Sequence, residues 1–224
     1  TKVSQLFPAG SFALLDSVNV LLIGIIVAIA ALLPRKGKYG PIATLLVAGD
    51  WLGVFLLSIL VMLVFDGLED LVQGFLDSIW FGVILLVTGI VSFVATLVSK
   101  TDSTRKLDGF LAPVKTPSWK TVGAGLILGI VQSATSVPFY AGLGYLSVGN
   151  FSPEIRYGGL VVYATLALSL PIIVAVLVGM VRKYPESPVG RLFELIGQNK
   201  ERVTKWSGYL VSLVLCIMGI TSIL

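Results

Sequence analysis

Two aspartates inside long apolar stretches are the residues of this chain best placed to do chemistry. Asp16 and Asp50 are the only carboxylates within those stretches, and no Lys or Arg lies in a stretch to pair with either. A charged side chain at the centre of a bilayer costs ~3 kcal/mol or more, so each acid needs a polar partner, water or a proton. Acids in such positions commonly bind substrates or carry protons.

Two short polar clusters in the apolar stretches match one another. Pro138 follows the second cluster and would release backbone carbonyls, which is typical of an interrupted helix that lines a cavity. We predict that the cluster side chains bind a substrate, although the same side chains could instead join helices by hydrogen bonds. The predicted substrate-binding residues are Asp16, Ser17, Asn19, Gln132, Ser133, Thr135 and Ser136.

Asp50 stands apart from both clusters, in the segment Ala48-Gly49-Asp50-Trp51. Burial disfavours the charged form of a carboxylate, so an acid at this depth readily holds a proton. We therefore predict that Asp50 couples transport to protons. The alternative is a structural role, in which protonated Asp50 is hydrogen-bonded to Thr44 or to a neighbouring helix.

Six apolar stretches must position these residues. Hydrophobic residues make up 56% of the 224 residues and charged residues only 12%, which leaves too little polar surface for a soluble domain. A helix crosses a bilayer with ~20 apolar residues. We predict an all-α, multi-pass protein of the cell (inner or plasma) membrane, with spans at Phe7 to Leu33, Ile42 to Phe65, Ser78 to Val98, Val122 to Tyr145, Tyr157 to Val181 and Trp206 to Leu224.

The Lys and Arg residues fall in every second connection between the stretches. Fourteen of the sixteen follow the first, third and fifth spans, and only Lys2 and Arg156 lie on the other side. The positive-inside rule places those three connections in the cytoplasm and both termini outside. The net charge of +4 then faces anionic membrane lipid, and we expect no nucleic-acid partner.

Three landmarks of the first half recur in the second half at similar spacing. The offsets of 116, 118 and 126 residues predict a duplication: a first three-helix repeat at 1–99, a cytoplasmic linker at 100–120 and a second repeat at 121–224. An odd number of spans makes the repeats inverted, as in many secondary transporters. The landmarks are Asp16-Ser17 with Gln132-Ser133, Tyr39-Gly40 with Tyr157-Gly158, and Trp80-Phe81-Gly82 with Trp206-Ser207-Gly208.

Two further patterns concern packing. Amphipathic stretches follow the second span, at Asp66 to Asp77, and the fifth span, around Leu192 to Ile196, and we expect them to seal opposite ends of the bundle rather than to act as gates. Small residues at Gly125 and Gly129, and at Gly24 with Ala28, predict that the first and fourth spans approach closely.

Histidine is absent and Cys216 is the only cysteine. This composition excludes an intramolecular disulfide, a dithiol relay, imidazole ligation of haem or zinc, and a His general base. No nucleophile and base can be paired by spacing. We therefore expect no enzymatic activity, no catalytic residues, no cofactor and no resident metal.

The segments Leu15 to Leu22 and Gly125 to Ser133 resemble the two half-motifs of the lysine-exporter superfamily. That resemblance implies six spans in an inverted three-plus-three arrangement. The superfamily includes amino-acid exporters, cadmium- and manganese-efflux relatives, and actinobacterial proteins thought to help move glycolipids to the cell surface. Its amino-acid exporters carry Pro-Gly-Pro-Asn and Asn-Pro, whereas here only Asn19 matches the first motif and Gln132-Ser133 replaces the second. The acidic first motif is closer to the glycolipid-associated and metal-efflux branches.

Three functions therefore remain open. The first is a proton-coupled secondary exporter of a small cationic or zwitterionic solute. The second is a component that translocates a lipid or glycolipid of the cell envelope, with the headgroup in the same polar cleft. The third is efflux of a divalent metal. A homodimer and a larger envelope partner both fit the sequence.

Overall fold

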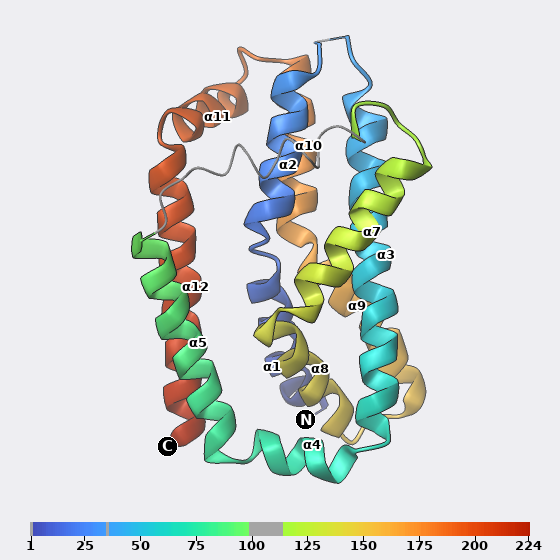
Figure 1. The fold of residues 1–224 in the computed structure, drawn as a ribbon, viewed down its shortest axis with the longest axis vertical. Helices are drawn as coiled ribbons and strands as arrows, with labels where there is room; N and C mark the ends of the chain where they lie inside the picture. Colours follow the sequence, from blue (N-terminus) through green and yellow to red (C-terminus); the bar gives the residue numbers. More distant parts are fainter. Residues whose placement is uncertain (1, 35, 99–113) are drawn as a thin grey trace.

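The computed structural model describes residues 2–34, 36–98 and 114–224, and it confirms the predicted all-helical class. No strand occurs in these three ranges. Figure 1 shows most of the long helices arranged along one axis, with α4 lying across one end. The helices are α1 (Lys2–Asp16), α2 (Val20–Leu32), α3 (Tyr39–Asp66), α4 (Glu69–Leu76), α5 (Ile79–Val98), α7 (Trp119–Ala134), α8 (Val137–Val148), α9 (Pro153–Ala167), α10 (Ser169–Lys183), α11 (Pro188–Gln198) and α12 (Lys200–Ile223).

Two unbroken helices, α3 and α5, are long and apolar enough to cross a membrane. Three bent pairs raise the number to as many as five if each pair is one span: α1 with α2 bends by 41°, α7 with α8 by 76°, and α9 with α10 by 44°. The sixth predicted span falls in α12, whose apolar part runs over Gly208–Ile223. The first, fourth and fifth predicted spans are thus each divided into two helices.

Prolines explain two of the three breaks. A proline lacks the N–H that would bond the carbonyl four residues earlier, and its ring clashes with that carbonyl. Pro138 therefore frees the Ala134 carbonyl, which accepts a hydrogen bond of 2.9 Å from the Tyr140 hydroxyl instead. Pro171 acts in the same way on Ala167, where α9 ends. The interruption before Pro138 was predicted, but the break in the fifth span was not.

The third break, between α1 and α2, rests on a side-chain cap. The Asn19 side chain accepts a hydrogen bond of 2.9 Å from the backbone N–H of Leu22 and so begins α2. Ser136 begins α8 in the same manner, because its hydroxyl accepts from the backbone N–H of Phe139 at 3.3 Å. Both residues satisfy amide groups that a helix start leaves without partners.

Helices α3 and α7 approach most closely through glycines. A Cβ at Gly49 or Gly53 would clash with carbonyl oxygens of α7, and a Cβ at Gly125 or Gly129 would clash with those of α3. The first and fourth spans do approach one another as predicted, but through α1 and α8 and not through the glycines predicted to make that contact. Nothing lies within 4 Å of a Cβ at Gly24, because the glycine face of the fourth span packs on the second.

Helices α5 and α12 stand side by side at one edge of the molecule (Figure 1). Gly82 and Gly219 allow their backbones to approach. Phe81 and Leu85 of α5 and Leu215 of α12 pack in one buried cluster with Phe12 and Leu76, which joins this pair to the rest of the fold.

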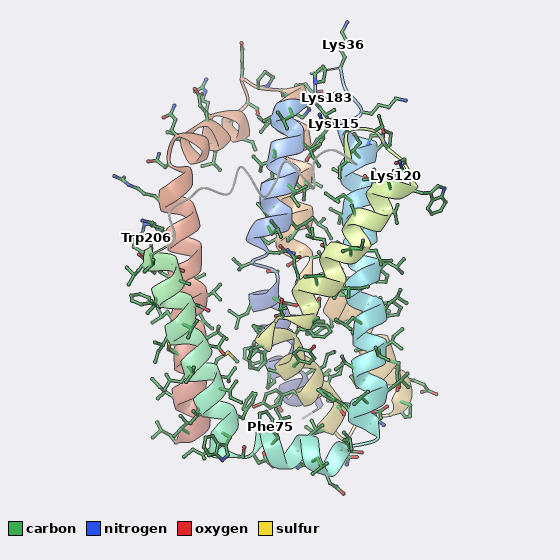
Figure 2. The ribbon with its side chains drawn as sticks, in the orientation of Figure 1. Lys36, Phe75, Lys115, Lys120, Lys183 and Trp206 are labelled. Atoms are coloured by element: carbon green, nitrogen blue, oxygen red, sulfur yellow. The ribbon has the colours of Figure 1, made fainter. Side chains whose placement is uncertain are left out.

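Both predicted amphipathic stretches form helices, and α4 and α11 lie at opposite ends of the molecule (Figure 1). Both chain termini lie toward the α4 end (Figure 1). Figure 2 shows Lys36, Lys115, Lys120 and Lys183 at the α11 end and Phe75 at the α4 end. Of the predicted linker, residues 100–113 lie outside the described residues, and α7 already begins at Trp119.

Candidate functional site

The three helix breaks meet α3 at one pocket of about 340 Å³. Each broken pair contributes the residues at its interruption, and α3 contributes Asp50 and Val54 from its middle section. The lining combines acids, amides and hydroxyls with a few aliphatic side chains. The residues are Asp16, Val18, Asn19, Leu21, Asp50, Val54, Gln132, Ser133, Thr135, Ser136, Ala167 and Leu168.

Side-chain hydrogen bonds join the α1–α2 break to the α7–α8 break. Asn19 and Gln132 pair through both amides: the Gln132 Nε2 donates to Asn19 Oδ1 at 2.8 Å, and the Asn19 Nδ2 donates to Gln132 Oε1. The Ser136 hydroxyl donates to Asp16 Oδ1 at 2.6 Å. The Tyr163 hydroxyl of α9 lies near the Asp16 carboxylate and donates to the Pro138 carbonyl at 3.4 Å. The Ser136 hydroxyl therefore holds Asp16 from the α7–α8 break.

These two contacts are equivalent in the proposed repeat. Gln132 follows Asp16 by 116 residues, and Ser136 follows Asn19 by 117. These two offsets differ by one residue, so the Asp16–Ser136 bond is the approximate counterpart of the Asn19–Gln132 bond under the predicted duplication. Asn19 and Ser136 are also the two capping residues of α2 and α8.

Asp50 differs from Asp16 because it has no partner in the part of the chain that the structure describes. Its side chain is fully buried, and neither carboxylate oxygen has a hydrogen-bond partner there. Thr44, the partner considered from sequence, is exposed and makes no bond to it. Burying a carboxylate without a partner is costly, so Asp50 must hold a proton or a ligand.

The position of Asp50 is set by backbone packing. Its carbonyl oxygen faces Gly129 and its backbone N–H faces Gly125, so α7 runs directly against this turn of α3. The next residue, Trp51, stacks on Phe55 one turn further along α3, with ring centroids 5.0 Å apart. The Trp51 indole donates to the Thr165 hydroxyl of α9 at 3.2 Å.

Most of the predicted site residues line this pocket, but one does not. Ser17 is buried outside the lining, and its hydroxyl donates to the Leu14 carbonyl at 2.5 Å in the last turn of α1. Thr135 lines the pocket at an exposed position, and its hydroxyl donates to the carbonyls of Val131 and Gln132. The Thr135 hydroxyl therefore bonds the backbone at the end of α7, and its methyl group is the part of the side chain left to contact a ligand.

The sequence patterns did not predict Leu168 or Ala167 in the lining, the aliphatic lining residues Val18, Leu21 and Val54, or Tyr163 near Asp16. Pro171 was the available signal for the first two, because it breaks the helix at the residue four positions earlier. Tyr163 carries no comparable signal, since a tyrosine in an apolar helix is usually a packing residue. Its closeness to Asp16 depends on how α9 crosses α1.

A second cavity lies between α3 and α10. It has a volume of about 590 Å³, is lined almost entirely by apolar groups, and extends from Tyr39 to Trp51 along α3 and from Ile172 to Gly179 along α10. Trp51 borders this groove while its neighbour Asp50 borders the polar pocket.

No family model, curated protein or solved structure matches this chain. Asp16 and Asp50 suit a cationic group, whereas the starts of α2 and α8 carry the partial positive charge that suits an anionic group. No group of three or more His, Cys, Asp or Glu residues that could hold a metal occurs in the three described ranges.

Proposed function

We propose that this protein is a secondary transporter that exports a small cationic or zwitterionic solute. The observation that carries the proposal is that three helix interruptions meet at one pocket with Asp50, an acid that has no hydrogen-bond partner among the described residues. Helix interruptions in membrane proteins leave backbone groups free to contact substrate and ions, and transporters place such sites near the middle of the bilayer.

The proposed architecture is six spans in two inverted repeats, with both termini outside the cell. Three observations support it: the equivalent bonds Asn19–Gln132 and Asp16–Ser136, the opposite positions of α4 and α11, and the lysines gathered at the α11 end. In this arrangement the α11 end faces the cytoplasm. The relation to the lysine-exporter superfamily is part of the same proposal.

Asp50 is the proposed proton carrier. Asp16 already receives a bond from Ser136, whereas the oxygens of Asp50 are buried and unpartnered among the described residues. A group that must be neutralised when the pocket is empty can exchange its proton for a cationic ligand. This exchange would couple solute export to proton entry.

Translocation of a lipid or glycolipid is the second candidate, and the apolar groove between α3 and α10 favours it. The groove could hold an acyl chain while the polar pocket beyond Trp51 holds the headgroup. Only lipid translocation requires the apolar groove, since a small polar solute would not bind there.

The deciding experiment is mass spectrometry of the small molecules and lipids that co-purify with wild type and with Asp16→Asn. Enrichment of a polar solute in the wild type, lost in the variant, supports the exporter. Enrichment of one lipid species, lost in the variant, supports lipid translocation instead. Ser11→Ala is a matched control, because that hydroxyl bonds only to the Phe7 carbonyl of its own helix.

A metal as the selectively retained species would replace both proposals with metal efflux. Equal recovery of all species from wild type and Asp16→Asn would contradict a substrate site at Asp16.

A further inference from the structure

Two polar clusters fasten α3 to the bent pair α9–α10, one at each end of α3. At the α11 end, the Arg182 guanidinium donates to three carbonyls at the end of α2: to Leu33 at 3.2 Å, to Pro34 at 2.6 Å and to Ala30. It also lies over the Tyr39 ring, 5.3 Å from the centroid. We call this set of contacts the Arg182 clamp.

Tyr39 completes the Arg182 clamp. It is the first residue of α3, its side chain is buried, and its hydroxyl donates to the Ala175 carbonyl of α10 at 2.9 Å. The clamp therefore ties the start of α3 and the end of α2 to α10. A half-buried guanidinium that donates to three carbonyls and lies over an aromatic ring is costly to separate from them.

At the α4 end, Asp66, Arg156 and Tyr157 form the second cluster, the Asp66 clamp. Arg156 forms an ion pair of 2.8 Å with Asp66 Oδ1, and the Tyr157 hydroxyl donates to Asp66 Oδ2 at 2.7 Å. Arg156 also donates to the Ser147 carbonyl at 3.4 Å. The clamp ties the last residue of α3 to the start of α9 and the end of α8.

The clamps occupy equivalent places in the repeat. Tyr157 follows Tyr39 by 118 residues, and Arg182 follows Asp66 by 116. In each clamp, a tyrosine near the start of one predicted span meets a charged residue just beyond the end of the other: Tyr39 meets Arg182, and Tyr157 meets Asp66. The charged residue is positive in the Arg182 clamp and negative in the Asp66 clamp. The clamps lie about 40 Å apart along α3 at 1.5 Å per residue.

The polar pocket and a bend lie between the clamps. Asp50 is in the middle part of α3, and the 44° break of α9–α10 at Leu168 borders the same pocket. A change of this bend would move the two halves of the pair against α3 independently. One clamp could then open while the other stays closed.

We propose that the two clamps are alternating gates, so that the Arg182 clamp closes the pocket toward the α11 end and the Asp66 clamp closes it toward the α4 end. The inference rests on the proposed transport function and adds how access to the site is controlled. The interruption at Leu168 serves as the hinge.

The test measures access to the pocket rather than transport. A reporter cysteine replaces Ser133, a buried residue of the pocket lining, in a Cys216→Ser background, and a membrane-impermeant maleimide is added to either face of oriented vesicles. We expect Asp66→Asn to raise the labelling rate from one face by about fivefold, and Arg182→Gln to raise it from the opposite face to a similar extent.

Milder variants guard against loss of the fold. Tyr157→Phe and Tyr39→Phe each remove one hydroxyl bond from one clamp, so each should act in the same direction as the charge variant of its clamp and more weakly. Asp66→Glu keeps the charge and should label more slowly than Asp66→Asn. If a properly folded Tyr157→Phe or Tyr39→Phe protein is labelled from both faces at the wild-type rate, the proposal that the clamps are gates is contradicted.

The labelling experiment tests the gates independently of the proposed transport function, because it measures access to the pocket and not transport. Opposite-sided changes in labelling support the gates, even if no solute or lipid is found to move. Equal changes from both faces, or changes on the same face for both clamps, overturn the gates even in a protein that transports.

Discussion

At the scale of single residues, the two acids of the pocket have different surroundings and so different expected roles. Asp16 is held by Ser136, whereas the Asp50 oxygens have no partner among the described residues. Asp16 is thus suited to position a ligand. Asp50 is suited to change its protonation state during the cycle.

Asp50→Asn should abolish proton-driven movement of the co-purifying substrate. The amide has nearly the same size but cannot release a proton, so we expect a fall of at least about tenfold in transport driven by a pH gradient across proteoliposomes. Substrate exchange without a gradient should persist. Asp77→Asn, at the exposed end of α4, is the control. Full gradient-driven transport by Asp50→Asn would remove Asp50 from the coupling step.

At the scale of the helices, the contact between α3 and α7 fixes the geometry around Asp50. Gly129→Ala places a methyl group against the Asp50 carbonyl and must push the two helices apart. We expect a loss of stability of about 1–3 kcal/mol, typical of overpacking, and a lower melting temperature in detergent.

Gly24→Ala is the matched control, because a methyl group there meets nothing within 4 Å. It should leave the melting temperature unchanged or raise it slightly, since alanine favours a helix over glycine by ~1 kcal/mol. Equal melting temperatures for Gly129→Ala and Gly24→Ala would show that the helices do not approach as closely as described.

At the scale of the whole molecule, the distribution of charge sets the expected orientation. Lysines lie at the α11 end, and Arg156, at the other end, is paired with Asp66. In a Cys216→Ser background, an impermeant thiol reagent outside intact cells should label Asn150→Cys, between α8 and α9, and not Lys36→Cys, between α2 and α3. Labelling of Lys36→Cys alone would reverse the orientation, and labelling of both at equal rates would contradict a sealed bundle.

The sequence by itself determined the features that depend on local composition. The apolar stretches predicted the helices, the charges between them predicted an orientation, and Pro138 predicted an interrupted helix. The polar clusters also predicted most of the pocket lining. Hydropathy, charge and proline chemistry act over neighbouring residues, so they can be recognised along the chain.

Only the tertiary structure decided which faces meet. Several helices here are apolar on nearly every side, so their sequences do not indicate a contact face. Helix rotation and crossing place Asp50 beside the Asp16 cluster, Gly129 on α3 rather than α2, and Tyr39 beneath Arg182. These contacts join residues far apart in the chain, and they depend on close packing that no local pattern encodes.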